Sequence, residues 1–512
     1  MKIAIKFNTI GCVCDRREKR VIVENKTMMQ YFEWYLPEDG LFWRRCAAQA
    51  GALRKAGVNM VWLPPAYKGA SGKRSVGYDV YDTYDLGEFA QKGSIATKYG
   101  CRRDYLRAVK HLQSQGIEVM ADVVLNHMMG ADATETVIAE EVCPSNRVQP
   151  LREPQQITAW TAFSFQGRRG KYSRFRWNAS HFSGIDLDVS TGQSGIFRFR
   201  GKEWNEETDS ENVNYDYLMG ADLDTDCPET VEAVTKWGRW YLNTVKPDGL
   251  RLDAVKHISF DFYRRWLRTM RRHARRDLFV VGEYWSDDLN RLTHYLDVTK
   301  NSLSLFDVPL HYHLLQAANA NGQFDMRTLF DNTLVGKRPE CSVTFVDNHD
   351  TQPGQALFSF IPAWFKPIAY ALILLGKEGI PCVFYGDYYG IPHDNIAPTP
   401  SLKKLIKLRE RFAYGEQRSY FDDASVVGFT RLGDREHPGS GMAVLVTDSA
   451  AGEKRMYVGS RFAGSVFYDA LASEQRATTI DSEGYGTFYV GESSAAAWVT
   501  EQAYQYTRVE ME

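Results

Sequence analysis

Three acidic residues stand at the carboxyl ends of strand-like stretches of this 512-residue chain. Asp253, Glu283 and Asp350 each come at or just after the end of a short apolar run. Such runs are typical of parallel strands buried on both faces, and the carboxyl ends of parallel barrel strands meet at one rim. Cleavage of a glycosidic bond needs one carboxylate as nucleophile or base and one carboxylic acid as proton donor. The acids therefore indicate a glycoside-cleaving site.

Arg251 sets the expected charge state of Asp253. It lies two residues earlier on the same strand, so the alternation of a strand points both side chains to one face. The guanidinium should lower the pKa of Asp253, as suits a nucleophile. Glu283 follows an apolar run and precedes Tyr284 and Trp285, so partial desolvation should raise its pKa, as suits a proton donor.

Each acid alone has a simpler explanation. A single Asp at a strand end usually caps a helix or forms a turn, and Arg251 with Asp253 could be a buried ion pair. Asp350 also has His349 beside it, and Asp253 is followed by Lys256 and His257. Three acids with such neighbours at strand ends on one rim favour a catalytic site over a structural explanation.

A second group of oxygen donors could hold a hard cation. Asn126 and His127 follow an apolar run, and Asp216 and Asp222 lie far along the chain. Amide and carboxylate oxygens are the ligands that Ca²⁺ prefers. From spacing alone, an acidic surface turn is a slightly better interpretation of the aspartates than a metal site. The run also lacks the glycine and distal glutamate of an EF-hand loop.

The order of apolar runs predicts the fold. Eight runs alternate with amphipathic segments such as 43–56, 104–114, 231–244 and 260–272, which predicts a (β/α)₈ barrel. The predicted strands are Met28–Trp34, Val58–Leu63, Ile117–Leu125, Gly249–Asp253, Leu278–Glu283, Ser304–Val308, Ser342–Val346 and Ile380–Tyr385.

Two intervals interrupt or follow this alternation. The long stretch 127–222 after the third strand predicts an inserted domain, because a structureless loop of that length is implausible. Short alternating runs after residue 415 predict a C-terminal antiparallel β-sandwich domain over 416–512. The barrel then spans 26–126 and 223–415, and residues 1–25 are expected to form an N-terminal extension.

Composition excludes several classes of protein. The net charge of −2 gives no bulk attraction to nucleic acid or acidic membranes. No apolar run approaches the ~20 residues of a transmembrane helix, and the first residues form no signal-peptide core, so a cytoplasmic location is expected. The eight cysteines form no C-x-x-C pair, which favours free thiols over zinc or disulfides. The basic, aromatic run Arg168–Arg176 could bind single-stranded nucleic acid, but a solvated surface is favoured.

Four segments closely resemble the signature segments of the α-amylase family, glycoside hydrolase family 13. They occur in the family's order as Asp122–His127, Gly249–His257, Gly282–Trp285 and Phe345–Asp350. The resemblance runs from about Met28 to Gly390, and it is greatest to the bacterial liquefying and cytoplasmic members. It implies the same barrel, with an inserted domain after the third strand.

The resemblance also implies a role for each matching residue. Asp253 is the expected nucleophile, Glu283 the general acid/base and Asp350 the transition-state stabiliser. The expected substrate-binding residues are Tyr78, His127, Arg251, Lys256, His257, Trp285 and His349. The expected ligands of one structural Ca²⁺ are Asn126, Asp216, Asp222 and the backbone oxygen of His257. Ser183 and Asn205 stand where related secreted enzymes carry acids, so no further metal is expected.

The expected activity is retaining, endo-acting hydrolysis of α-1,4-glucosidic bonds in starch, glycogen and maltodextrins by a monomer. This mechanism predicts carboxyl groups of Asp253 and Glu283 about 5–5.5 Å apart. One alternative is a transglycosylating or exo-acting relative, such as an α-glucosidase or a glucanotransferase. The other is a catalytically silent glucan-binding protein on the same scaffold. The sequence does not determine product length, branch tolerance or pH optimum.

Overall fold

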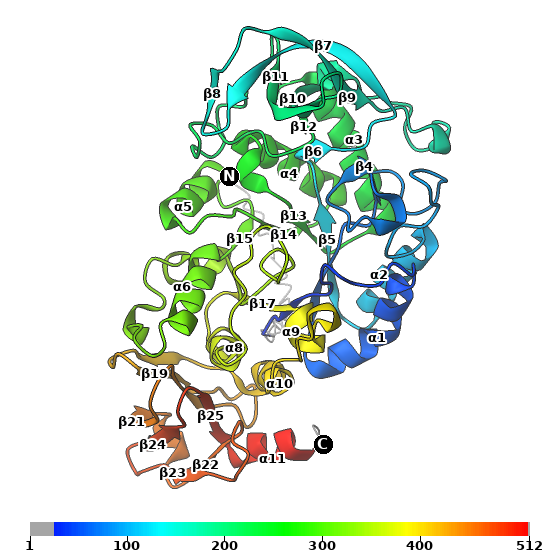
Figure 1. Cartoon of the computed structure of the whole chain (residues 1–512). Coiled ribbons are helices and arrows are strands. Elements are labelled where there is room, and N and C mark those ends of the chain that lie inside the picture. The colour runs from blue at the N-terminus through cyan, green and yellow to red at the C-terminus, as the bar shows by residue number, and fades with distance from the viewer. Residues whose placement is uncertain (1–24, 510–512) are drawn as a thin grey trace, which may run out of the picture.

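A closed barrel of parallel strands forms the centre of the molecule (Figure 1). A computed structural model of the chain describes residues 25–509. The predicted N-terminal extension, apart from Asn25, lies outside the described residues. The barrel strands are β1 (Met28–Gln30), β2 (Met60–Leu63), β5 (Glu118–Val123), β13 (Gly249–Leu252), β14 (Phe279–Gly282), β15 (Ser304–Phe306), β16 (Ser342–Phe345) and β17 (Ile380–Phe384). Each one overlaps a predicted strand, so the barrel prediction is confirmed.

Helices cover the outside of the barrel, as the alternating pattern requires. They are α1 (Phe42–Ala56), α2 (Arg102–Ser114), α3 (Pro228–Val245), α4 (Phe260–Ala274), α5 (Leu289–Val298), α6 (Val308–Asn319), α8 (Lys366–Leu375) and α10 (Leu402–Phe412). Every residue of β2, β13 and β16 is buried, which explains why these strands appear in the sequence as continuous apolar runs. At Gly249 a Cβ would lie 2.3 Å from the carbonyl oxygen of Phe279, so this position of β13 requires glycine.

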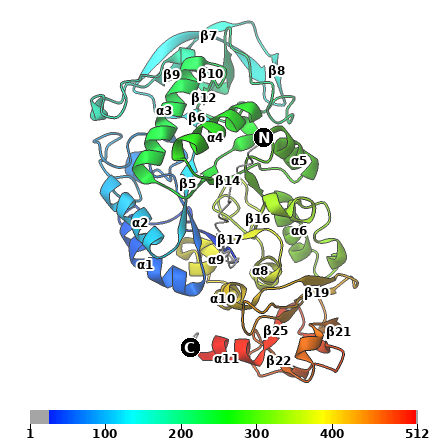
Figure 2. The ribbon, with the colours of Figure 1, turned by 180° about the vertical axis from the view of Figure 1, so that it is seen from behind.

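The inserted domain leaves the barrel after β5, its third strand. It forms a seven-stranded sheet of β6 (His127–Met128), β7 (Ala133–Cys143), β8 (Asn146–Pro150), β9 (Gln155–Ala162), β10 (Phe182–Asp188), β11 (Gln193–Phe199) and β12 (Ala221–Leu223). Phe163, Phe182 and Phe197 belong to its separate apolar core. Both views place this sheet at the opposite end of the barrel from the C-terminal domain (Figures 1 and 2).

The C-terminal domain consists of antiparallel strands, as predicted. One sheet contains β18 (Gln417–Tyr420), β19 (Val426–Arg431), β20 (Met442–Thr447), β25 (Ala495–Thr500), β22 (Val466–Asp469) and β23 (Ala477–Thr479), and a second pairs β21 (Gly452–Tyr457) with β24 (Tyr485–Val490). Leu445, Met456, Phe488 and Trp498 form part of the core shared by the two sheets. The domain packs on the barrel through contacts of β20 and β25 with α8.

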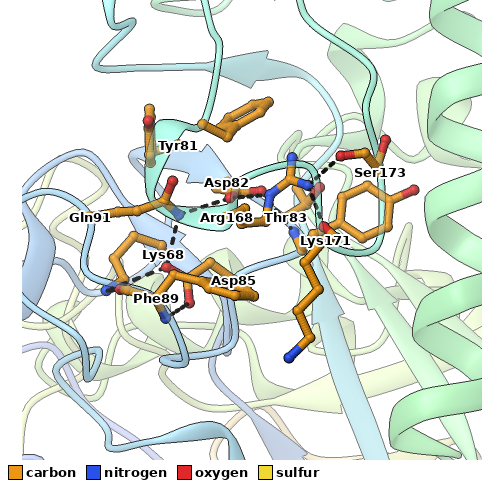
Figure 3. A network of polar contacts seen from close by, with 12 residues as sticks. Lys68, Tyr81, Asp82, Thr83, Asp85, Phe89, Gln91, Arg168, Lys171 and Ser173 are labelled. Carbon is orange, nitrogen blue, oxygen red and sulfur yellow. Dashed lines mark hydrogen bonds and ion pairs between the residues drawn. The ribbon is translucent and has the colours of Figure 1, made fainter.

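Arg168 fastens the inserted domain to the loop that follows β2 (Figure 3). Its Nε lies 2.7 Å from Oδ2 of Asp82, the last residue of β4 (Val80–Asp82). The side-chain amide of Gln91 donates to both Asp82 and Asp85, at 2.9 and 3.0 Å. Lys68 lies 3.5 Å from Asp85, and both of these side chains are fully buried. The network therefore joins two segments that are distant in sequence.

The expectation of a solvated surface is wrong for the first residue of the basic run. Arg168 is only 3% exposed, because its guanidinium also donates to the carbonyl oxygens of Lys171 and Ser173, each at 2.7 Å. The adjacent Arg169 is exposed, as expected. Burial of one arginine in such a run depends on a distant acid and could not be predicted from spacing.

This pair predicts a large stability difference between adjacent arginines. Arg168→Ala should lower the free energy of unfolding by about 3–5 kcal/mol, because it leaves the buried Asp82 carboxylate unpaired. Arg169→Ala is the matched control and should change it by less than about 0.5 kcal/mol. Urea unfolding followed by tryptophan fluorescence measures both. Equal stabilities of the two variants would contradict the docking role of Arg168.

Candidate active site

A cleft opens at the carboxyl ends of the barrel strands. Its volume of about 630 Å³ is within the range of small-molecule sites. The predicted residues that line it are Tyr78, His127, Asp253, Lys256, His257, Glu283, Trp285 and Asp350. Trp34, on the loop after β1, also lines the cleft and was not predicted. The structure thus brings together side chains from the loops that follow six different barrel strands.

Arg251 lies beneath the cleft and contacts three acids. Its side chain is fully buried on β13. Nη1 lies 2.9 Å from Oδ1 of Asp122 and 2.7 Å from Oδ1 of Asp253, and Nη2 lies 2.7 Å from Oε2 of Glu283. The contact with Asp253 confirms that the two side chains share one face of the strand. One guanidinium therefore holds carboxylates from three neighbouring strands.

Asp122 is a site residue that the sequence reasoning did not assign. The register of β5 and β13 pairs it directly with Arg251. Its Oδ2 accepts hydrogen bonds from Trp62 Nε1 and Tyr78 Oη, both at 2.9 Å. Asp122 thereby positions the Tyr78 ring at the cleft wall. An acid in the middle of the apolar run Ile117–Leu125 was the available signal.

Asp350 lines the cleft, and His349 lies beside it, next to Tyr78. Nε2 of His349 lies 3.3 Å from Oδ2 of Asp350, and the backbone amide of Asp350 donates to Asn348 Oδ1 at 2.8 Å. The His349 ring stacks on Tyr78 with centroids 4.9 Å apart. Trp34 is nearly parallel to both rings, at 6.3 Å from Tyr78 and 6.1 Å from His349. Aromatic faces of this kind suit stacking against a sugar ring.

Burial controls the protonation of the acids. It raises the pKa of Asp253 well above the usual value, and Glu283 and Asp122 raise it further, although Arg251 opposes the shift. Arg251 favours ionisation of Asp253, as predicted, but the predicted net lowering of this pKa is wrong because burial outweighs the guanidinium. Burial, followed by repulsion from Glu283, raises the pKa of Asp350 to about 7. Several acids around one cation cannot all ionise, so the group titrates as a unit.

The histidines of the cleft are neutral hydrogen-bonding groups near pH 7. Burial lowers the pKa of His127, whose Nε2 lies 2.8 Å from the carbonyl oxygen of Tyr78. Burial, together with the charge of Lys256, lowers the pKa of His257 to about 3. Nδ1 of His257 lies 2.8 Å from the carbonyl oxygen of Tyr215. These contacts hold both rings in fixed orientations.

Lys256 and Trp285 occupy separate parts of the cleft wall. Lys256 Nζ pairs with Glu211 of the inserted domain at 2.9 Å, and its cation lies 4.8 Å from the Tyr215 ring centroid. Nε1 of Trp285 donates to Tyr312 Oη at 3.1 Å. Glu211 was not predicted, since nothing in its sequence neighbourhood marks it as a partner of Lys256.

The predicted calcium ligands lie around the junction of barrel and inserted domain. The Asn126 amide donates to Asp222 Oδ1 at 3.4 Å and to the backbone oxygen of His257 at 3.0 Å. Asp216 and Asp222 are each 1% exposed, and the charge of Asp216 disfavours ionisation of Asp222. Residues 25–509 contain no cluster of three or more His, Cys, Asp or Glu side chains suited to a metal. The candidate set instead combines two carboxylates with amide and backbone oxygens.

The neighbours of these aspartates are neutral donors. Ser183 Oγ donates to Asp222, and the Asn205 amide donates to Asp216 Oδ1 at 2.9 Å. Two buried like charges bonded to neutral groups are costly unless a cation or a proton accompanies them. Burial raises the pKa of both carboxyls, that of Asp216 to about 7. The set therefore fits a hard, oxygen-binding cation such as Ca²⁺.

Comparisons with known proteins agree with this geometry. Residues 51–431 match the family model described as the α-amylase catalytic domain. An α-amylase of Geobacillus stearothermophilus is 52% identical over 494 residues, covering 95% of this chain and 89% of the relative. A cytoplasmic α-amylase of Escherichia coli strain K12 is 41% identical over 495 residues, covering 94% of this chain and all of the relative.

The fold is also found among solved structures. The α-amylase of Geobacillus thermoleovorans, solved with acarbose, matches with a TM-score of 0.62 at 18% identity. The match covers 93% of this chain and 98% of that structure. The matched catalytic domain covers most of the chain and contains the four signature segments. On this basis the chain belongs to the α-amylase family of glycoside hydrolases.

Proposed function

We propose that this protein hydrolyses internal α-1,4-glucosidic bonds of starch, glycogen and maltodextrins with retention of configuration. The supporting observation is that Asp253, Glu283 and Asp350 line one cleft, with Arg251 bound to the first two. The names of the relatives point to the same activity, since several are α-amylases of bacteria. The presence of all three acids argues against a silent glucan-binding protein.

Two carboxyl groups divide the chemistry. Glu283 donates its proton to the bridging oxygen while Asp253 attacks the anomeric carbon, so the glucosidic bond breaks as a covalent ester forms. Glu283, now ionised, takes a proton from water, whose oxygen displaces Asp253 and restores both groups. Retention requires carboxyls about 5–5.5 Å apart. Contact of both side chains with one guanidinium favours such a short separation.

The remaining cleft residues bind and orient the sugar. Tyr78 stacks against the ring at the cleaved bond, and His127 and His349 form hydrogen bonds with its hydroxyl groups. Asp350 stabilises the positive charge that develops on the sugar in the transition state. Lys256, His257 and Trp285 line the adjoining part of the cleft.

One structural Ca²⁺ is part of the proposal. Asn126, Asp216, Asp222 and the backbone oxygen of His257 would hold it. When bound, it neutralises buried negative charge and fixes the inserted domain against the barrel. Ser183 and Asn205 are neutral and already donate to the two aspartates, which supports a single ion.

A monomeric, cytoplasmic enzyme completes the proposal. Six described cysteines, Cys46, Cys101, Cys143, Cys227, Cys341 and Cys382, are free thiols, as a reducing compartment favours. No helix within residues 25–509 has the length and apolar character to span a membrane. The domain division proposed is 26–126 and 223–415 for the barrel, 127–222 for the insertion and 416–512 for the β domain. Separate apolar cores in the last two support it.

Substitution of either reacting acid tests the mechanism. Glu283→Gln should lower kcat on amylose by a factor on the order of 10²–10⁴, because general acid–base catalysis is lost. Asp253→Asn should lower it at least as much, because the nucleophile is lost. The exposed Asp277→Asn is the control and should retain normal turnover. Reducing-sugar release measures all three, and normal turnover by either active-site variant would refute the assignment.

The time course of soluble-starch breakdown separates endo from exo action. With an endo-acting enzyme, viscosity and iodine colour of soluble starch fall before reducing sugar accumulates. NMR of the first product should show the α-anomer, as retention requires. Early release of glucose alone, or growth of longer maltodextrins, would favour the α-glucosidase or glucanotransferase alternatives.

Because the pKa of Asp350 is raised, replacing this residue by Asn should stabilise the fold, and the gain should depend on pH. Its pKa is about 7 in the fold and about 3.9 in the unfolded chain, so folding is weakened as pH rises through this interval. Asp350→Asn removes this loss, worth at most about 4 kcal/mol. Its melting temperature relative to wild type should therefore be higher at pH 8 than at pH 5. A difference that is constant with pH would contradict the shift.

Chelation tests the calcium site. EDTA should lower the melting temperature, and Ca²⁺ at 100 times its Kd should restore about 2.7 kcal/mol of stability. Asp222→Asn should abolish this Ca²⁺-dependent shift, whereas Asp277→Asn should leave it intact. Calorimetric titration should give one ion per chain. Wild-type protein with no thermal response to Ca²⁺ would contradict the site.

A further inference from the structure

Asp209 belongs to the inserted domain and lies in the segment between β11 and β12. Its side chain is completely buried, although it carries a carboxyl group. Oδ2 accepts a hydrogen bond from Tyr284 Oη at 2.5 Å, and Oδ1 accepts one from the backbone amide of Glu211 at 2.7 Å. Oδ1 also pairs with Nη1 of Arg291 on α5. A buried acid with this many donors is held in one position.

Tyr284 connects this acid to the proton donor of the proposed mechanism. It follows Glu283 directly at the end of β14 and is 2% exposed. Its ring packs against Phe260 and Tyr295, with centroids 6.2 and 5.2 Å away. Its hydroxyl is bonded to Asp209 alone among the described side chains. Asp209 therefore fixes the direction in which the chain leaves β14.

The backbone of the same residue holds the neighbouring loop. The Asp209 amide donates to the carbonyl oxygen of Lys256 at 3.0 Å, and its carbonyl accepts from the Tyr215 amide at 2.9 Å. Lys256 follows the nucleophile Asp253 on the loop after β13. One residue thus contacts both strand-end loops that carry the reacting acids, and it comes from neither strand.

Glu283 depends on this support because few groups fix its side chain. Oε2 contacts Arg251 at 2.7 Å and the Ala254 amide at 3.4 Å. Oε1 is buried and has no hydrogen-bond partner among residues 25–509. Its place in the cleft therefore depends on Arg251 and on the backbone at 283 and 284. Proton transfer is sensitive to such placement, since a shift of about 1 Å can cost 10²-fold in rate.

We propose that Asp209 is a positioning residue that aligns the general acid Glu283 through the hydroxyl group of Tyr284. The inference rests on the proposed function, because it takes Glu283 as the proton donor. A positioning role for Asp209 differs from a purely structural role in which substrates are affected when the residue is lost. Loss of alignment slows only those reactions whose leaving group needs a proton, whereas general loosening of the cleft slows all of them.

Two substrates separate these effects. The glucosidic oxygen of maltopentaose leaves as a poor alkoxide unless it is protonated, whereas fluoride leaves α-maltotriosyl fluoride without a proton. Asp209→Asn and Tyr284→Phe should each lower kcat/KM for maltopentaose by about tenfold or more, and that for the fluoride by less than about twofold. Because kcat/KM reports steps up to the first bond cleavage, the later role of Glu283 as base does not affect the comparison.

Two further variants calibrate the result. Glu283→Gln should show the same selectivity to a greater degree. Tyr241→Phe removes another buried hydroxyl, which lies 3.0 Å from Tyr105 Oη on the outer helices, and should lower melting temperature without any substrate selectivity. Thermal melts of all variants at the assay pH identify any that do not fold.

The outcomes distinguish the inference from the function it rests on. If Asp209→Asn and Tyr284→Phe slow both substrates equally, or slow neither, the positioning role is wrong while the proposed function stands. If Glu283→Gln itself hydrolyses maltopentaose normally, the acid assignment is wrong and the inference is overturned with it. If Asp209→Asn does not fold, Tyr284→Phe alone decides, because Phe keeps the ring packing and removes only the hydroxyl.

Discussion

The ion pairs of Arg251 are the interaction on which the cleft depends. Three carboxylates lie on neighbouring strands or at their ends: Asp122 within β5, Asp253 after β13 and Glu283 after β14. Their negative charges would repel one another in a buried space. A single guanidinium offers enough donors in one plane to bind carboxylates on more than one side. Because the cation is fully buried, it cannot be replaced by water. The acids are held close enough for two-carboxyl chemistry only because this charge lies between them.

The single positive charge of Arg251 does not balance the negative charges of Asp122, Asp253, Glu283 and Asp350, and this imbalance is useful. Asp350 also lines the cleft, and burial, followed by repulsion from Glu283, raises its pKa to about 7. An acid that titrates near neutral pH suits a site in which a proton is donated and later recovered from water. The arrangement costs folding free energy, which is a common property of active sites. The large barrel core compensates for it.

The inserted domain completes the cleft that the barrel begins. Its contacts with the rest of the molecule include the Arg168 network, the candidate calcium ligands and the segment around Asp209. The first fixes β4, which follows Tyr78, and the last fixes the loops that carry Glu283 and Lys256. The walls of the cleft therefore depend on contacts between segments that are distant in the sequence.

The sequence by itself determined the barrel, the insertion, the β domain and the acids that meet at the rim. Strands buried on both faces leave continuous apolar runs, and strand ends have a fixed direction, so Asp253, Glu283 and Asp350 could be placed together without coordinates. Only the tertiary structure decided the partners and charge states: Asp122 beneath Arg251, the raised pKa of Asp253, the burial of Arg168 and the contact of Asp209 with Tyr284. The physical reason is that periodicity is a local property of the chain. Burial and electrostatic interaction depend on which distant segments surround a group. The order of residues in the sequence does not show which segments those are.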